Sequence, residues 1–370
     1  MTPPWRTPDE PVRTRSVRTD PVRAGPARTD PVRAGDNERQ AHSMICVLAG
    51  GVGAARFLDG LVTVTGDEPV VAVVNTGDDT ELHGLTICPD LDTVTYTLSG
   101  QNDRQRGWGL AGETWSAMDA LERFGAARPA GSGAGATWFR LGDRDLATHL
   151  YRSHRLGEGA PLSTVTAEIA TAFGLGFTLL PMTDDRVRTM VTLAADGREI
   201  GFQEYFVGLQ HGVSISGVRF EGIEVASPAP GVIDALDEAR VIVIAPSNPI
   251  VSIGPILAVA GVLETLVRRR EHVVAVSPII GGKALKGPAD RMLSELGLAS
   301  SAVGVAAQYR HVCATLVIDE QDAALAADVA AVGVRAVVTD TIMRDTGRAA
   351  VLARAVLSAG APTGAGGRAG

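Results

Sequence analysis

Short apolar runs that alternate with helical stretches constrain the fold more than any other feature of this sequence. The runs are continuously apolar and each ends near Gly, Asn, Pro or Ser, which is typical of parallel strands buried on both faces. They cover residues 45–48, 70–74, 241–245 and 273–276. Helical patterns lie between them, at 54–64, 232–239, 262–270 and 289–296. This alternation predicts an α/β fold with a doubly wound, Rossmann-like parallel sheet.

Residues 100–230 have a different character. Helical patterns at 113–124, 143–155 and 162–173 precede two alternating stretches, 186–194 and 199–207, which flank the turn dipeptide Asp196-Gly197. Such a dipeptide between alternating stretches predicts a β-hairpin. We therefore expect 100–230 to form a smaller inserted α+β cap domain, and 44–99 with 231–358 to form the Rossmann-like nucleotide-binding domain.

Both ends of the chain are predicted to be poorly ordered. Residues 1–43 contain the sequence RTDPVRAG twice, at 18–25 and 28–35, and offer no apolar face. They are expected to be a disordered arm, or to precede a translation start at Met44. Residues 359–370, rich in Gly and Ala, are expected to be a loose tail.

Composition restricts the partners. Lys and Arg total 34 against 42 Asp and Glu, a net charge of −8, which argues against binding to nucleic acid or an anionic membrane. No apolar run approaches the roughly 20 residues that a membrane-spanning helix needs, and residues 1–40 lack the apolar core of a signal peptide. Cys46, Cys88 and Cys313 have no disulfide or zinc spacing. We expect a cytoplasmic protein.

A glycine turn follows the first apolar run directly, with Gly50, Gly51 and Gly53 before a helix. A strand, glycine turn and helix present bare N–H groups to a phosphate. The dinucleotide fingerprint requires a small residue where Arg56 stands and an acid where Asn75 ends the second strand, so NAD is disfavoured. A tight connection without any ligand is the alternative.

Four carboxylates follow the second strand, namely Asp78, Asp79, Asp90 and Asp92. They repel one another unless water or a cation separates them, and oxygen ligands near a phosphate site suit Mg²⁺. Any one of them is also a good helix cap. Another acidic stretch, residues 141–149, is best interpreted alone as a capped helix start.

Two later segments offer polar groups at strand ends. Ser247 and Asn248 lie between two prolines, in a turn that suits a base or a phosphate or is simply rigid. Lys283 and Lys286 follow the next strand but do not complete a Walker loop. They would bind a diphosphate as point charges, or be solvated surface lysines.

Taken together, these segments resemble the 2-phospho-L-lactate transferases of coenzyme F-420 biosynthesis, the CofD family with its actinobacterial FbiA branch. The resemblance extends from Met44 to about Ser358. Its most specific stretches are 50–57 (GGVGAARF), 75–79 (NTGDD), 88–93 (CPDLDT), 106–109 (RGWG), 141–149 (LGDRDLATH), 246–249 (PSNP) and 277–283 (SPIIGGK).

This resemblance implies a Mg²⁺-dependent phosphotransferase that modifies the ribityl hydroxyl of the deazaflavin FO and releases GMP. The donor would be a guanosine diphosphate ester of phosphoenolpyruvate, as in the actinobacterial branch, or of 2-phospho-L-lactate. Abundant Ala, Gly, Arg and Val favour the former. Small-molecule substrates and a homodimer are expected, without nucleic acid or membrane. The alternatives are a sugar-nucleotide-binding regulatory protein of the same fold family and an ordinary Rossmann dehydrogenase.

The same resemblance assigns roles to individual residues. Asp78 and Asp92 are expected to be catalytic and to hold Mg²⁺, and Asp92 and Arg140 to approach FO. The residues expected to bind the donor nucleotide and its phosphates are Gly50, Gly51, Gly53, Asn75, Ser247, Asn248 and Lys283.

Overall fold

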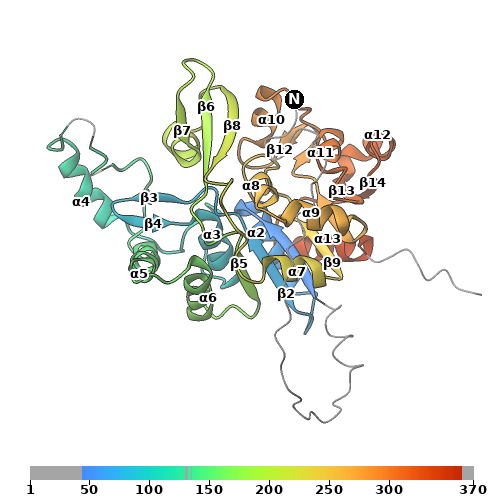
Figure 1. The fold of residues 1–370 in the computed structure, drawn as a ribbon, viewed down its shortest axis with the longest axis horizontal. Helices are drawn as coiled ribbons and strands as arrows, with labels where there is room; N and C mark the ends of the chain where they lie inside the picture. Colours follow the sequence, from blue (N-terminus) through green and yellow to red (C-terminus); the bar gives the residue numbers. More distant parts are fainter. Residues whose placement is uncertain (1–43, 130–131, 135, 361–370) are drawn as a thin grey trace, which may run out of the picture.

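The computed structural model describes residues 44–129, 132–134 and 136–360 (Figure 1). The expected arm, 1–43, and residues 361–370 of the expected tail lie outside these ranges. The last described helix, α13 (Thr346–Ala359), includes the first residue of that expected tail.

Seven parallel strands form the largest sheet of the described residues. The chain builds this sheet outward from its first strand to one edge, and then returns to build the other side. The order across the sheet is β14 (Arg335–Thr339), β13 (Thr315–Asp319), β10 (Val273–Val276), β9 (Val241–Ile244), β1 (Ile45–Ala49), β2 (Val70–Val74) and β5 (Thr178–Pro181). The direction of building therefore reverses between β1 and β9, and the predicted doubly wound, Rossmann-like fold is confirmed.

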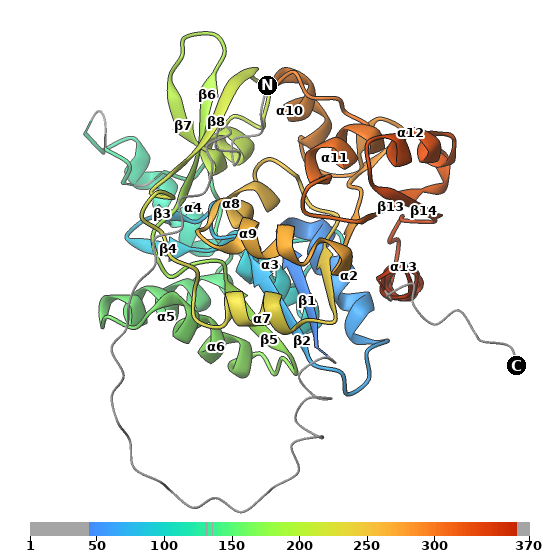
Figure 2. The same ribbon diagram turned by 45° about the vertical axis from the view of Figure 1, so that its right-hand side comes forward.

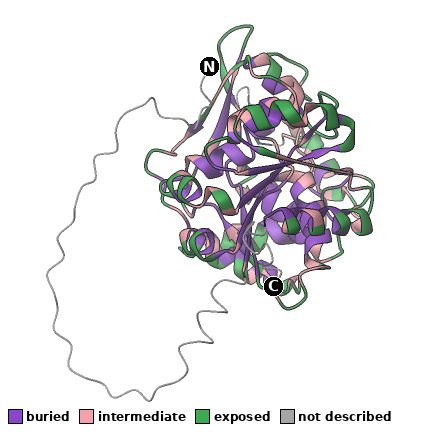
Figure 3. Ribbon diagram, turned by 90° about the vertical axis from the view of Figure 1, so that its right-hand side faces the viewer, coloured by how far each residue is buried: buried purple, intermediate pink, exposed green. Residues whose placement is uncertain are grey.

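Both faces of this sheet are buried along β1, β2, β9 and β10, which explains the continuous apolar runs (Figure 3). Along β1, Cys46 and Leu48 belong to one hydrophobic core, and Ile45 and Val47 belong to the other. Because successive side chains point to opposite faces, every position of such a strand must be apolar.

Helices cover the two faces. The core that contains Ile45 packs against α2 (Gly51–Val62), α3 (Pro89–Leu98) and α13. The core that contains Cys46 packs against α7 (Val232–Glu238), α8 (Ile253–Ala258), α9 (Val262–Arg268), α10 (Ala289–Glu295), α11 (Ala302–Tyr309) and α12 (Ala326–Ala331). The helices predicted at 54–64, 232–239, 262–270 and 289–296 are thus present, with ends that differ by a few residues.

The crossover from β2 to β5 is long and carries much of the segment expected as a cap. It contains the hairpin β3 (Thr80–Leu82) and β4 (Leu85–Ile87), then α3, α4 (Ser116–Gly125), α5 (Asp145–Gly157) and α6 (Leu162–Ala172). Its end, β5, belongs to the parallel sheet, so the sheet extends into the range 100–230. This short edge strand is only partly apolar, and its sequence gives little signal of burial.

A small antiparallel sheet follows β5 and projects from the body in both views (Figures 1 and 2). It consists of β6 (Arg188–Leu193), β7 (Glu199–Gly201) and β8 (Ile215–Glu221), in the order β7-β6-β8. The predicted hairpin is confirmed, since Met190 pairs with Gly201, but its second strand ends early at the π-helical turn η1 (Glu204–Gly208). Shorter elements are η2 (Arg270–His272), β11 (Ile279–Ile280), β12 (Lys283–Ala284) and η3 (Glu320–Leu325).

Candidate active site

A cavity of about 590 Å³ opens at the carboxyl ends of β1 and β9, where the order of the sheet reverses. Ligands bind at this point in doubly wound folds because the two loops diverge there. The loops are joined by Ser247, whose hydroxyl donates to the Gly50 carbonyl at 2.8 Å and accepts the Gly50 N–H at 3.3 Å. Gly50, Gly51, Gly53, Ser247 and Asn248 all line the cavity.

The glycine turn requires its glycines. Gly51 has φ +72°, which other residues rarely adopt. A Cβ at Gly53 would lie 2.3 Å from the Pro246 carbonyl oxygen, so the helix can approach the turn after β9 only without a side chain there. The N-terminus of α2 is thereby brought to the cavity, as an anion site requires.

Asp90 already occupies part of that turn. Its carboxylate accepts the Gly51 N–H at 2.8 Å and the Asn75 side-chain amide at 3.0 Å. Burial raises the pKa of Asp90 to about 6, although both hydrogen bonds act in the opposite direction. Asn75 is fully buried, does not line the cavity and also accepts the Gly77 N–H at 2.9 Å. The structure thus places Asn75 behind Asp90, in support of the turn.

Asp78 is the least satisfied acid at the cavity. It is 6% exposed, and its Oδ1 atom has no hydrogen-bond partner. Burial, and then the nearby Asp90 carboxylate, raise the pKa of Asp78 well above its ordinary value. Asp79 has an equally unpartnered Oδ1 and adjoins Asp78 at a second cavity of about 200 Å³. Free carboxylate oxygens of this kind fit a cation such as Mg²⁺.

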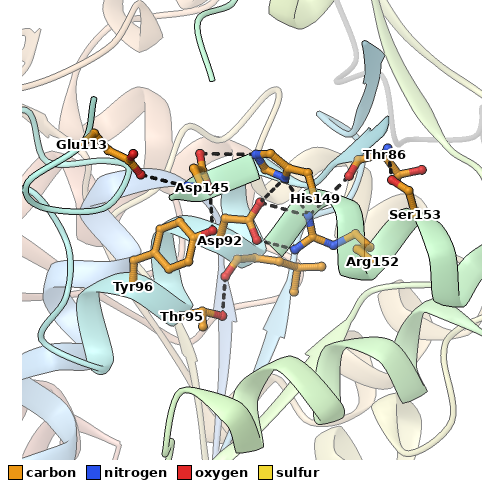
Figure 4. Close-up of polar contacts among 10 residues, drawn as sticks. Thr86, Asp92, Thr95, Tyr96, Glu113, Asp145, His149, Arg152 and Ser153 are labelled. Atoms are coloured by element: carbon orange, nitrogen blue, oxygen red, sulfur yellow. Dashed lines mark hydrogen bonds and ion pairs between the residues drawn. The ribbon is translucent and has the colours of Figure 1, made fainter. Parts of the chain in front are cut away.

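Asp92, by contrast, lies in a network of hydrogen bonds and ion pairs between α3 and α5 (Figure 4). Both of its oxygens accept from the Arg152 guanidinium, one of them at 3.1 Å. Its Oδ2 also lies 3.7 Å from His149 Nδ1, and His149 Nε2 lies 3.3 Å from Asp145 Oδ2. The Tyr96 hydroxyl donates to Asp145 at 2.5 Å. We call Asp92, Tyr96, Asp145, His149 and Arg152 the α3–α5 network.

Arg152 is 2% exposed. Burial disfavours its charge, but Asp92, Cys88 and Tyr96 together outweigh this, and the pKa of Arg152 is raised. The sequence prediction did not single out Arg152, and it interpreted Asp145 and His149 as part of a helix start. Their spacing, 145, 149 and 152, places all three on one face of a helix, and this was the available signal.

One group of side chains in the described residues could hold a metal ion, namely Asp92, Asp145 and His149. Their ligand atoms lie within 4.8 Å of one another. Two of these side chains are largely taken up by Arg152 and Tyr96. Of the two acids expected to hold Mg²⁺, Asp78 keeps an oxygen without a partner at the cavity, whereas both oxygens of Asp92 accept from Arg152.

Aromatic residues and cations form the rim. The Arg140 guanidinium lines the cavity, lies 5.5 Å from the Trp115 ring and donates to Glu122 at 3.2 Å. Arg106 lies 5.3 Å from the ring of Trp108, which is also at the cavity. A planar ligand would find aromatic faces on this side of the cavity.

The remaining predicted residues differ in position. Asn248 lines the cavity, but its Oδ1 accepts the Ile250 N–H at 2.9 Å and so also stabilises its own turn. Lys283 is exposed on β12 and does not line the cavity, whereas Lys286 does. Arg56, which departs from the dinucleotide fingerprint, also lines it.

Comparisons with known proteins agree with this geometry. Residues 45–356 match the family described as 2-phospho-L-lactate transferase CofD. A phosphoenolpyruvate transferase of Streptomyces griseus is 44% identical over 316 residues, covering 85% of this chain and 97% of that protein. A phosphoenolpyruvate transferase of Nocardia farcinica is 46% identical over 280 residues, covering 74% of this chain and 82% of that protein.

A crystal structure of a UPF0052-family protein from Bacillus halodurans shares the fold alone. It has a TM-score of 0.53 and 15% identity, covering 85% of this chain and 99% of that one. The fold and the cavity define a Rossmann-like protein with a cavity at the switch point of its sheet. The chain belongs to the CofD family of 2-phospho-L-lactate transferases and is a transferase. None of the helices in the described ranges is long and apolar enough to cross a membrane.

Proposed function

We propose that this protein transfers the phosphoenolpyruvyl group from its guanosine diphosphate ester to the ribityl hydroxyl of FO. The hydroxyl oxygen attacks the phosphorus that carries the enolpyruvyl group, the bond from this phosphorus to the bridging oxygen of GMP breaks, and GMP leaves. The hydroxyl proton passes to a carboxylate. Relatives named phosphoenolpyruvate transferase favour this donor over the 2-phospho-L-lactyl ester.

The observation that carries the proposal is the composition of the cavity. Its lining combines a glycine turn joined to a Ser-Asn turn, the three acids Asp78, Asp90 and Asp92, and aromatic residues such as Trp108. Phosphoryl transfer needs alignment and neutralisation of charge more than covalent help. The nucleotide would lie along the two turns, and the deazaflavin against the aromatic rim.

Mg²⁺ would be held by Asp78 and Asp92, and when bound it would neutralise charge on the transferred phosphoryl group. Asp78 supplies the free oxygen. Asp92 is fixed by Arg152, so its carboxylate keeps one orientation in which to meet the FO hydroxyl. Burial raises the pKa of Asp78, so its carboxylate holds a proton more tightly than an ordinary aspartate does.

The test is to incubate the protein with FO, Mg²⁺ and each of the two guanosine diphosphate esters, and to separate the deazaflavin products by chromatography. We expect one GMP for each FO consumed, faster turnover with the enolpyruvyl ester, and no reaction when Mg²⁺ is chelated. Calorimetry should show binding of GDP and none of NAD. Tight NAD binding without a response to GDP would contradict the proposal.

A further inference from the structure

Two cations lie close together at the cavity, and the function described so far does not use them. Arg56 is on the second turn of α2, and Lys286 is in the loop after β12. The loop 106–109 passes between them at Gly107, which has φ +84°. A Cβ at Gly107 would lie 2.9 Å from Lys286 Nζ and 3.9 Å from an Arg56 guanidinium nitrogen. The absence of a side chain at Gly107 therefore lets both cations reach the same point.

Neither cation is neutralised. Within the described residues, Arg56 has no ion pair or hydrogen bond from its side chain, and Lys286 Nζ donates only to the Arg106 carbonyl, at 3.5 Å. The other two arginines named at the rim differ, since Arg106 pairs with Asp103 at 3.0 Å and Arg140 with Glu122 at 3.2 Å. Arg56 and Lys286 thus bring two unneutralised positive charges close together at the cavity. Arg344, the other lining cation without an ion pair among the described residues, is exposed.

Two like charges held together without a counter-ion are unfavourable, and an anion between them removes the repulsion. The repulsion affects Lys286, because burial and then the charge of Arg56 lower the pKa of its amine. Arg56 stands where the dinucleotide fingerprint has a small residue that packs the helix on the strand. Here the long side chain reaches into the cavity instead.

The pair lies between the glycine turn and the aromatic rim. A Cβ at Gly107 would lie 3.3 Å from Val52 of the glycine turn, and Gly107 is followed directly by Trp108 of the rim. An anion bound by Arg56 and Lys286 would lie between the nucleotide and the acceptor. In a transfer reaction this is the place of the group that is transferred.

We propose that Arg56 and Lys286 form an anion subsite that binds the acidic end of the transferred group, a carboxylate or phosphate of an enolpyruvyl or lactyl phosphate, and not the diphosphate of the nucleotide. The inference rests on the proposed function for the identity of that group. It adds two specificity-determining residues that distinguish a carboxylate-bearing donor from GDP itself.

Calorimetry with two probes, GDP and phosphoenolpyruvate, tests the subsite without turnover. We expect Arg56→Gln and Lys286→Gln to weaken phosphoenolpyruvate binding roughly ten- to hundredfold, as the loss of one charge-assisted hydrogen bond predicts, and to change GDP binding less than about twofold. In the assay with FO, KM for the donor should rise by a similar factor while kcat changes little. Lys286→Arg, which keeps the charge, should restore most of the affinity.

The matched control is Arg104→Gln, because Arg104 is an exposed cation on the neighbouring loop that does not line the cavity. It should leave both affinities and KM unchanged. The unfolding midpoint of each variant shows whether it folds normally. Where a variant loses binding because it is unfolded, the affinity of Lys286→Arg decides. Equal loss of GDP and phosphoenolpyruvate binding would overturn the proposal, as would no loss of either. If the wild type binds both probes with this pattern but does not consume FO, the subsite stands and the proposed function fails.

Discussion

The acidic floor of the cavity has two halves that differ in how well they are satisfied. In the α3–α5 network, Asp92 and Asp145 receive hydrogen bonds from Arg152 and Tyr96. At the end of β2, Asp78 keeps a buried oxygen without a partner. The carboxylates of the first half thus have partners within the protein, although the Arg152 Nε atom has none, whereas the carboxylate of the second half lacks a partner for Oδ1.

This difference separates two ways in which an acid can serve an active site. A paired carboxylate is fixed in direction, because moving it would leave a buried charge unpaired. An unpaired buried carboxylate destabilises the folded state until it binds a cation or a proton. It therefore binds a cation or a proton more tightly than a paired carboxylate does. The comparison predicts that stability depends mainly on the α3–α5 network, and response to ligand mainly on Asp78.

The largest effect is expected from Arg152→Met, which removes the partner of Asp92 and leaves its buried carboxylate unpaired. Breaking a buried pair in this way costs about 3–5 kcal/mol. Urea unfolding at neutral pH measures this loss, together with the midpoint and slope of the transition.

Arg155→Met is the matched control, because Arg155 lies one turn further along α5 and pairs with Glu158 and Glu168 near the surface. Exposed pairs contribute about 0–1 kcal/mol, so this variant should remain close to the wild type. Equal losses from the two variants would show that the α3–α5 network is no more important to stability than a surface pair.

Asp78→Asn should have the opposite profile. Because burial raises the pKa of Asp78, its charge is unfavourable at neutral pH, and removing that charge should leave the protein as stable as before or more so. Turnover should fall on the order of 10²-fold or more, as when one electrostatic contact to the reacting group is lost.

The melting temperature with added Mg²⁺ separates the two roles of Asp78. Wild-type protein should be stabilised as Mg²⁺ increases, because a ligand that binds only the folded state stabilises it. Asp78→Asn should lose most of this response. If Asp78→Asn melts well below the wild type and is still stabilised by Mg²⁺, then Asp78 supports the fold and does not bind the ion.

Sequence alone could predict which turns form this site, but not which acid pairs with which cation. Apolar runs determine where β1 and β9 end, so the positions of Gly50 and Ser247 at one edge of the sheet followed from topology. The partnership of Asp92 with Arg152 spans 60 positions and depends on how α5 packs against β4, which no local pattern encodes. Likewise, Asn75 was expected to meet the donor, yet its amide supports Asp90 because the turn after β2 folds back beneath α3.

Asp90 stands outside both halves, at the glycine turn, and should produce a smaller, pH-dependent effect. Its folded pKa is about 6, against an ordinary value of 3.8, so the folded state holds this proton more tightly than the unfolded chain. Stability contributed by the neutral acid is present at low pH and is lost as pH rises from about 4 to about 6.

The difference in unfolding free energy between wild type and Asp90→Asn, measured by urea titration at several pH values, isolates this contribution. Relative to the variant, the wild type should lose stability between pH 4 and 6 and then reach a plateau. Burial of Asp78 acts in the same direction at higher pH. A difference that is flat across this range would mean that Asp90 has the same pKa in the folded and unfolded states, and would contradict the prediction.

The smallest effect is expected at Glu113, which holds the start of α5 from outside the helix (Figure 4). Its carboxylate accepts the N–H groups of Arg144 and Asp145 at 2.8 Å and 2.9 Å, and so replaces a missing N-cap side chain. Glu113→Gln leaves one acceptor oxygen for two donors and removes a negative charge from the positive end of the helix dipole. Such a change costs about 1 kcal/mol.

If the α3–α5 network is fixed mainly by its internal bonds, Glu113→Gln should lower the urea midpoint slightly and leave kcat within a small factor of the wild type. Glu122→Gln, on exposed α4, is the control and should change stability by less than about 0.5 kcal/mol. A large fall in kcat from Glu113→Gln, with little loss of stability, would instead show that the direction of α5 is set at its first turn. In that case Asp92 would depend for its orientation on a residue 21 positions away and outside the α3–α5 network.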